Sequence, residues 1–154
     1  MNTNYAIPLF KGIRGKYSFL SNFHPVPIRV EDITYSSVEH AYQAMKTIDK
    51  EARKRISLMI PGQAKRAGKL VELRDGWEDM KITVMKNLLD IKFSNPELAS
   101  LLLETGDEIL EEGNNWRDTY WGVYKGQGSN HLGELLMVIR NELREDRRRK
   151  RARK

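Results

Sequence analysis

The sequence predicts a single α+β domain that is dominated by helices and carries a small antiparallel sheet. Residues 5–35 are rich in Tyr, Phe, Ile and Val and are interrupted by Pro and Gly, which is typical of short strands and turns. From Ser36 onward the apolar residues recur at helical spacing. A chain of 154 residues with 40% hydrophobic content is long enough to bury a sizeable core.

The individual elements follow in chain order. Residues 27–30 and 33–35 form an expected hairpin around Glu31 and Asp32. Pro61 and Gly62 break the helical pattern between the second and third helices. Residues 107–129 lose the helical period and are either a strand with a long loop or a binding loop. The expected helices begin near Ser37 and cover about 37–48, 50–60, 63–70, 77–93, 96–105 and 131–146.

Composition excludes several classes of protein. The chain has no cysteine, which rules out disulfides, thiolate zinc sites and a cysteine nucleophile. Its longest apolar run, residues 135–139, is too short to span a bilayer, and the N-terminus lacks the apolar stretch of a secretory signal. We therefore expect an intracellular protein without a membrane contact.

The net charge of +6 comes from the C-terminal end. Residues 147–154 hold seven of the 27 basic residues, which leaves 20 basic against 21 acidic residues in the rest of the chain. We therefore expect a domain over residues 1–146 and a basic, disordered tail over 147–154. Such a tail can contact nucleic acid or serve as a nuclear address, which would make the protein nuclear rather than cytoplasmic. A solubilising end is the alternative.

The first candidate site opens the helix near Ser37. Ser36 and Glu39 have the spacing of a capping box, in which the Glu39 carboxylate bonds back to the Ser36 amide. Alternatively, Glu39, Gln43 and Lys46 form one polar stripe on an otherwise apolar helix. Because seven residues turn a helix through about 700°, Glu39 and Lys46 face the same way and can approach one small ligand. A surface ladder of ion pairs has the same spacing.

The second candidate site lies in the segment before the last helix. Asp118 precedes a glycine-rich stretch with Gly126 and Gly128, and Asn130 is an expected N-cap. Free amides at a helix start favour anions, and glycines let the backbone approach a phosphate. Four aromatic residues crowd this segment and suit either a stacking surface for a base or the anchoring of the loop in the core. They are Trp116, Tyr120, Trp121 and Tyr124.

Metal and nucleotide-cofactor motifs are missing from the sequence. The three histidines, His24, His40 and His131, do not have metal-ligand spacing. A Walker loop, a strand-coupled GxGxxG and a nucleophile elbow are also absent. We therefore expect neither a metal nor a cofactor.

At these residues the sequence resembles the NADAR family, also called YbiA-like, over residues 17–143. The spacer from Glu111 to Asp118 is longer than the family's, and the basic tail lies outside its pattern. The matching segments keep the family order, and they are 19–23, 37–46, Trp77, 92–93, 102–106, Asp118 with 121–122, and 130–137.

The resemblance implies an N-glycosidase that acts on ribosyl or ADP-ribosyl substrates. It makes Glu39 the expected catalytic carboxylate and Asp118 a second carboxylate or proton donor. Lys46 offers an alternative route through a Schiff base with an opened ribose. The positions carried over as substrate contacts are Ser21, Asn22, Trp77, Trp121, Gly126, Gly128 and Asn130. Trp77 can equally be a core anchor, and Ser21 and Asn22 can be turn residues.

Two branches of the family differ in substrate. One removes ADP-ribose from guanine in nucleic acid, and the other hydrolyses phosphorylated intermediates of riboflavin biosynthesis. The basic tail favours the first branch, because it suits an ADP-ribosylated nucleic acid better than a small ribosyl phosphate. Two non-enzymatic alternatives are a module that only binds ADP-ribose or NAD, and a nucleic-acid-binding protein that acts through its tail.

Overall fold

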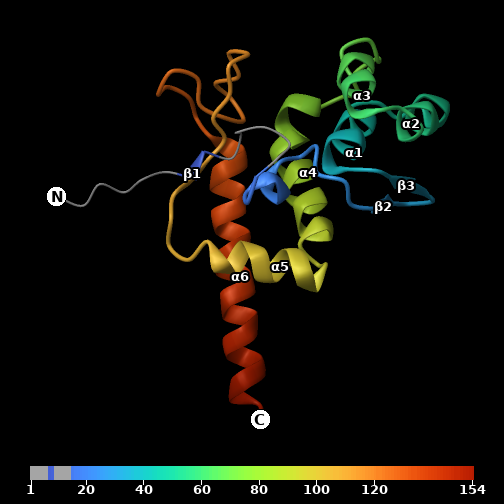
Figure 1. Cartoon of the computed structure of the whole chain (residues 1–154). Helices are drawn as coiled ribbons and strands as arrows, with labels where there is room; N and C mark the ends of the chain where they lie inside the picture. Colours follow the sequence, from blue (N-terminus) through green and yellow to red (C-terminus); the bar gives the residue numbers. More distant parts are fainter. Residues whose placement is uncertain (1–6, 9–14) are drawn as a thin grey trace. The chain divides into compact units, whose positions relative to one another are not determined.

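The computed structural model of the chain describes residues 7–8 and 15–154. These residues divide into two compact units, which we describe separately. The helical unit is Asn22–Lys92, and the terminal unit is Phe93–Lys154 with the described part of Met1–Ser21. Six α-helices and a two-stranded antiparallel sheet confirm the helix-dominated α+β class (Figure 1).

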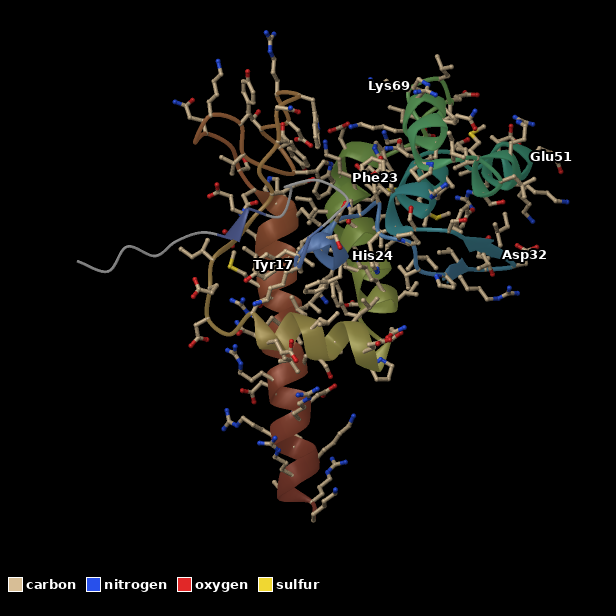
Figure 2. All side chains as sticks on the ribbon, viewed as in Figure 1. Tyr17, Phe23, His24, Asp32, Glu51 and Lys69 are labelled. Atoms are coloured by element: carbon tan, nitrogen blue, oxygen red, sulfur yellow. The ribbon has the colours of Figure 1, made fainter. Side chains whose placement is uncertain are left out.

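The helical unit is built around its first helix. Helix α1 contacts the hairpin and every other helix of this unit, with α2 and α3 packed beside it (Figure 1). The predicted hairpin is confirmed, since β2 and β3 pair antiparallel with Ile28 opposite Tyr35. Figure 2 shows Asp32 at the hairpin tip and Glu51 on α2, both pointing away from α1. The elements are β2 (Ile28–Val30), β3 (Ile33–Tyr35), α1 (Val38–Met45), α2 (Lys50–Ser57), α3 (Pro61–Ala67) and α4 (Trp77–Lys92).

Several predicted boundaries in this unit differ from the structure by a few residues, and two of the differences concern helix starts. Pro61 does not separate two helices but is the first residue of α3, where its missing N–H and fixed φ fit the helix start. Helix α1 begins beside Ser37 as expected, but its N-cap is Ser37 and not Ser36. The Ser37 hydroxyl accepts the backbone N–H of His40 at 3.3 Å. The expected capping box is therefore wrong, and the Glu39 carboxylate bonds elsewhere.

Ser37 also fixes the imidazole of His40. The Nε2 atom of His40 lies 2.7 Å from the Met59 carbonyl oxygen, and its Nδ1 atom lies 2.6 Å from the Ser37 hydroxyl. Because a carbonyl can only accept, Nε2 carries the proton and Nδ1 accepts from Ser37. His40 is 1% exposed, and this pair of bonds satisfies both of its ring nitrogens. His40 is therefore a structural residue of the α1–α2–α3 core.

The terminal unit joins short strands to two helices. Strand β1 pairs in parallel with β4, a long-range contact that the sequence pattern did not indicate. Asn95 caps α5 through bonds from the Glu97 and Leu98 amides, as expected for a helix that begins at Pro96. The elements are β1 (Ile7–Pro8), the 3-10 turn η1 (Ser18–Leu20), α5 (Pro96–Glu104), β4 (Leu110–Glu111) and α6 (His131–Ala152).

The basic tail is helical through most of its length. Helix α6 continues to Ala152, so its expected end at Asp146 and the expected disorder of the tail are wrong. Arg, Lys and Ala are good helix formers, and a run of them extends a helix that packing has already nucleated. The side chains of residues 145–154 are exposed along this extension.

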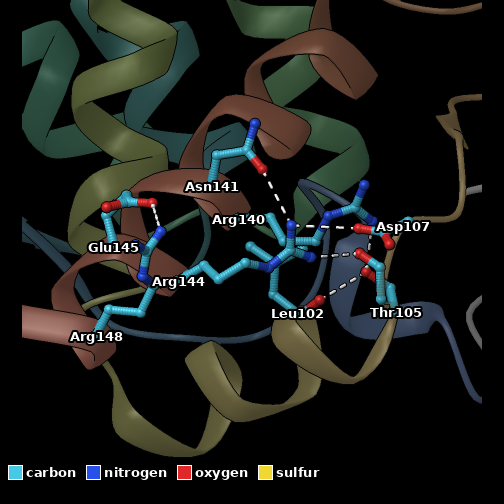
Figure 3. Close-up of polar contacts among 9 residues, drawn as sticks. Leu102, Thr105, Asp107, Arg140, Asn141, Arg144, Glu145 and Arg148 are labelled. Atoms are coloured by element: carbon cyan, nitrogen blue, oxygen red, sulfur yellow. Dashed lines mark hydrogen bonds and ion pairs between the residues drawn. The ribbon is translucent and has the colours of Figure 1, made fainter. Parts of the chain in front are cut away.

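Two arginines of α6 hold the end of α5 (Figure 3). Arg140 donates to the Thr105 hydroxyl at 2.8 Å, and that hydroxyl donates to the Leu102 carbonyl oxygen at 2.6 Å. Arg144 donates to the Gly106 carbonyl oxygen at 2.8 Å and pairs with Asp107 at 3.2 Å. These bonds satisfy carbonyls at the C-terminal end of α5 and fix its packing on α6.

Replacing Ser37 by alanine tests the revised cap. The variant loses the cap of α1 and leaves the buried Nδ1 of His40 without its donor, so we expect the free energy of unfolding to fall by about 2–4 kcal/mol. Urea unfolding followed by circular dichroism measures this change. Ser36→Ala is the matched control, since Ser36 is exposed and should change stability by less than about 0.5 kcal/mol. A larger loss of stability in Ser36→Ala than in Ser37→Ala would contradict the revised cap and support the capping box.

Candidate active site

Glu39 is a buried carboxylate in the first turn of α1. The residue is only 8% exposed, and its Oε1 accepts a hydrogen bond from Gln43 Nε2 at 2.8 Å. Its backbone N–H donates to the Asn22 carbonyl oxygen at 3.0 Å. Since Ser37 performs the capping, the carboxylate is left for another role.

Burial raises the pKa of Glu39 above its ordinary value. Three influences oppose this rise without cancelling it: the hydrogen bond from Gln43, the ammonium groups of Lys65 and Lys46, and the neighbouring His40. A raised pKa makes the ionised carboxylate a stronger base, which is a common property of catalytic acids and bases. The predicted stripe of Glu39, Gln43 and Lys46 is therefore present, with its first two members hydrogen-bonded.

Lys46 lies at the C-terminal end of α1 beside an aromatic ring. Its Nζ is 5.4 Å from the centre of the Tyr42 ring, and the residue is half-buried. Burial, followed by the charges of Lys81 and Lys69, lowers the pKa of Lys46, while Glu39 acts in the opposite direction. A lowered pKa increases the fraction of neutral amine, the form that attacks a carbonyl.

Two further predicted residues lie in the helical unit. Asn22 is 8% exposed, its Nδ2 lies 3.7 Å from Met85 Sδ, and its Oδ1 is buried without a hydrogen-bond partner among the described residues. Because its carbonyl holds the Glu39 amide, Asn22 and Glu39 are neighbours. Trp77 is 5% exposed and packs on Tyr42 with ring centres 5.3 Å apart, which favours the core-anchor interpretation.

The other predicted residues belong to the terminal unit. Ser21 follows η1, where its N–H donates to the Ser18 carbonyl oxygen at 3.1 Å. Asp118 Oδ1 accepts the backbone N–H groups of Tyr120 at 3.0 Å and Trp121 at 2.9 Å. One carboxylate oxygen of Asp118 therefore holds its own loop in shape, a role that spacing alone did not indicate.

The start of α6 does not offer free amides to an anion. The N–H groups of residues 129–132 donate to the carbonyl oxygens of Thr119, Gly122, Tyr120 and Trp121 at 2.8–3.3 Å. The expectation of open amides is therefore wrong for these four N–H groups, and phosphate binding by the loop stays a prediction. The preceding loop folds back over the helix end and satisfies these donors internally.

Asn130 occupies the N-cap position but does not cap the helix with its side chain. It adopts a left-handed conformation with φ 53°, and its side chain bridges α6 to β4. Its Oδ1 accepts the Glu112 amide and its Nδ2 donates to the Leu110 carbonyl oxygen, both at 2.9 Å. The expected capping by Asn130 is replaced by this clamp.

The two glycines of the loop have structural reasons of their own. Gly126, with φ +76°, completes a two-residue turn with Lys125 between the paired Tyr124 and Gln127. Gly128 has φ +148°, and a Cβ there would collide with the Gly122 carbonyl oxygen. The turn geometry accounts for both glycines without a ligand. A phosphate contact at Gly126 or Gly128 therefore stays a prediction.

The aromatic residues of the loop gather at the first residue of α6. The Tyr120 ring lies 4.9 Å from Trp121 and 4.5 Å from His131, centre to centre. Tyr120 and Trp121 are half-buried, whereas Trp116 is 38% exposed. Packing on His131 accounts for part of the cluster, which supports the anchoring interpretation, and stacking on a base stays a prediction.

Two residues near the stripe were missed at the sequence level: Lys65, whose charge acts on Glu39, and Gly68, which lies against Gln43. Lys65 and Gly68 both lie on or next to α3, more than 25 positions along the chain from Glu39. Neither has a motif or a periodic signal that connects it with α1. The packing of α3 against α1 brings the charge of Lys65 toward Glu39 and the backbone of Gly68 against Gln43.

The described part of the chain has neither a group of three or more metal-ligating side chains nor a helix long and apolar enough to cross a membrane. The geometry is that of a carboxylate and a lysine on one buried helix. It suits acid–base chemistry or a lysine nucleophile.

Comparison with known proteins places this geometry in a family. The NADAR domain matches residues 9–144. The chain is 39% identical over 132 residues to the N-glycosidase YbiA of Escherichia coli, with 82% of each chain covered. It is 35% identical over 136 residues to the N-glycosidase Npun_R5314 of Nostoc punctiforme, covering 83% of this chain and 86% of that one.

A longer relative and a solved structure agree with this. The chain is 37% identical over 134 residues to the riboflavin biosynthesis protein VVA0006 of Vibrio vulnificus, of which it spans only 36%. The NMR structure of the Escherichia coli protein YbiA superimposes with a TM-score of 0.80 at 34% identity, covering 95% of this chain and 92% of that one. The resemblance found in the sequence is confirmed, and the chain belongs to the NADAR family.

Proposed function

We propose that this protein is an N-glycosidase that hydrolyses the bond between ribose C1′ and a nitrogen atom of an ADP-ribosyl or ribosyl-phosphate substrate. The observation that carries the proposal is the state of Glu39, which is buried, free of capping and raised in pKa. The names of the relatives from Escherichia coli and Nostoc punctiforme support the reaction class.

The chemistry needs a carboxylate at this place. As the C1′–N bond breaks, its electron pair goes to the nitrogen and positive charge develops on the ribose. A carboxylate beside C1′ stabilises that charge and takes a proton from the attacking water, whose oxygen bonds to C1′. The nitrogen of the leaving base gains a proton in turn. Glu39 performs the first role in this scheme.

Asp118 is the second carboxylate of the proposal. Only its Oδ1 is used by the loop amides, so the carboxyl group keeps an oxygen with which to protonate the leaving base. Lys46 supports an alternative route, in which its neutral amine bonds to C1′ as the ribose ring opens and the base leaves with a proton. Water then hydrolyses the resulting Schiff base, which releases the ribosyl aldehyde and restores the amine.

The substrate we favour is ADP-ribosylated guanine in nucleic acid. The exposed end of α6 supports this choice, because it presents basic side chains that can contact phosphates. These are Arg149, Lys150, Arg151, Arg153 and Lys154. A second candidate is a phosphorylated intermediate with an N-linked ribose, since the Vibrio vulnificus relative is named a riboflavin biosynthesis protein. Deletion of residues 147–154 should raise KM for nucleic-acid substrates and leave KM for small ribosyl phosphates unchanged.

Glu39→Gln tests the catalytic carboxylate. The purified chain is incubated with an oligonucleotide that carries ADP-ribosylated guanine, and separately with a ribosylamino-pyrimidine phosphate, and products are followed by mass spectrometry. We expect release of ADP-ribose from the oligonucleotide, reduced by about 10²–10⁴-fold in the variant because a general base is lost. Glutamine keeps the size and the acceptor oxygen of the side chain, so the fold should persist.

Glu51→Gln is the matched control, because Glu51 is an exposed carboxylate in the first turn of α2. Full activity of Glu39→Gln would contradict the carboxylate scheme. Cleavage of the pyrimidine compound alone would select the second substrate. If neither compound is cleaved but ADP-ribose raises the melting temperature, the protein is a binding module. With ADP-ribose at 100 times its Kd, the free energy of unfolding should rise by about 2.7 kcal/mol.

Sodium borohydride distinguishes water attack from the lysine route. Direct attack by water predicts that borohydride traps no covalent adduct during turnover. In the lysine route, hydride reduces the Schiff base to a stable amine, and mass spectrometry finds the ribosyl group on Lys46. An adduct that disappears in Lys46→Ala but persists in Lys69→Ala would contradict direct attack; Lys69 is an exposed lysine whose charge also acts on Lys46.

A further inference from the structure

We propose that Gln43 and Gly68 are positioning residues for the Glu39 carboxylate. Gly68, which has no side chain, leaves the space in which the Gln43 amide lies, and that amide holds the carboxylate in one orientation. The inference rests on the proposed function of Glu39. It adds Gln43, which contacts Glu39 directly, and Gly68, which contacts Gln43. Gly68 immediately precedes Lys69, which is labelled at the end of α3 in Figure 2.

Gly68 is not required by the backbone conformation. It is the C-cap of α3 with φ −61° and ψ −21°, a right-handed conformation that alanine adopts without strain. Glycine at such a position is less favourable than alanine for helix stability. A Cβ at residue 68 would, however, collide with Gln43 Oε1 and lie 2.6 Å from Gln43 Cδ. The contact with Gln43 is therefore the physical reason for the glycine.

The Gln43 amide is held by packing on one side and by a hydrogen bond on the other. Its Oε1 lies against Gly68 and is buried without a hydrogen-bond partner among the described residues. Its Nε2 donates to Glu39 Oε1 at 2.8 Å. A rotated amide would place its oxygen against the carboxylate, which is unfavourable, so the orientation is unique. With Gln43 only 5% exposed, the amide has no solvent into which it could turn.

The hydrogen bond from Gln43 stabilises the ionised form of Glu39. Burial raises the pKa of Glu39, and the Gln43 donor is the largest influence that lowers it. The charged or titratable groups that also face Glu39 are Lys65 on α3 and Lys46 and His40 on α1. Loss of the Gln43 donor should therefore raise the pKa of Glu39 further and also free the carboxylate to rotate.

The test compares Gly68→Ala, Gln43→Ala and the double variant with wild type. Two properties are measured: the pH titration of the Glu39 side-chain carboxyl carbon by ¹³C NMR, and kcat and KM for the substrate that wild type cleaves. Gly62→Ala is the matched control in the same helix, because a Cβ there meets only Arg66 Nη1 at 3.7 Å. Thermal unfolding confirms that each variant folds.

We expect both single variants to raise the pKa of Glu39, to shift the acid limb of kcat to higher pH and to lower kcat by about 10²-fold with little change in KM. Gly62→Ala should match wild type. The double variant should resemble Gln43→Ala alone, because the added methyl group then enters the space that the amide has left. Such non-additivity identifies a shared contact.

An unchanged Glu39 titration in folded Gly68→Ala would overturn the role of Gly68, and an unchanged titration in Gln43→Ala would overturn that of Gln43. Additive effects in the double variant would show that the two residues act separately, which also contradicts the proposal. If wild type cleaves no substrate while the titration shifts as expected, the proposed function fails and the positioning of Glu39 stands.

Discussion

The burial of α1 on every side is the constraint on which the helical unit depends. All eight residues of this helix are buried, and three of them, Glu39, His40 and Gln43, are polar. Polar groups in such a place depend mainly on partners inside the protein, because they are little exposed to water. His40 is satisfied by Ser37 and Met59, and Glu39 is satisfied by Gln43. The same helix therefore supplies the core of the unit and its reactive groups.

The choice of cap decides what the carboxylate does. Ser37 and not Ser36 is the N-cap of α1, and its hydroxyl accepts the His40 amide. Glu39 is therefore one residue too early for a capping box, and its carboxylate bonds to Gln43 instead. A buried carboxyl with a raised pKa does not favour the folded state above its ordinary pKa, since the folded chain then disfavours the charged form. Stability therefore does not account for this buried carboxyl, whereas the proposed catalytic role does.

Periodicity and turn signals predicted the helices and the hairpin, because the apolar faces of α1, α4 and α6 are regular and uninterrupted. They could not choose between two adjacent serines as the cap of α1, since both have the required hydroxyl. They also could not find the contact of Gly68 with Gln43, which arises from packing between α3 and α1. The run of basic residues predicted a disordered tail, yet the helix propensity of Arg, Lys and Ala lets α6 continue to Ala152.

The central claim is that the Glu39 carboxylate faces the ribose carbon whose bond is cleaved. A crystal structure of Glu39→Gln with uncleaved ADP-ribosyl-guanosine tests this claim most directly, since the variant should bind the substrate without turning it over. The account predicts that ribose C1′ lies about 3–3.5 Å from the side chain of residue 39 or from a water held by it. A substrate bound elsewhere, with residue 39 still packed against Gln43 and away from the ribose, would contradict the account.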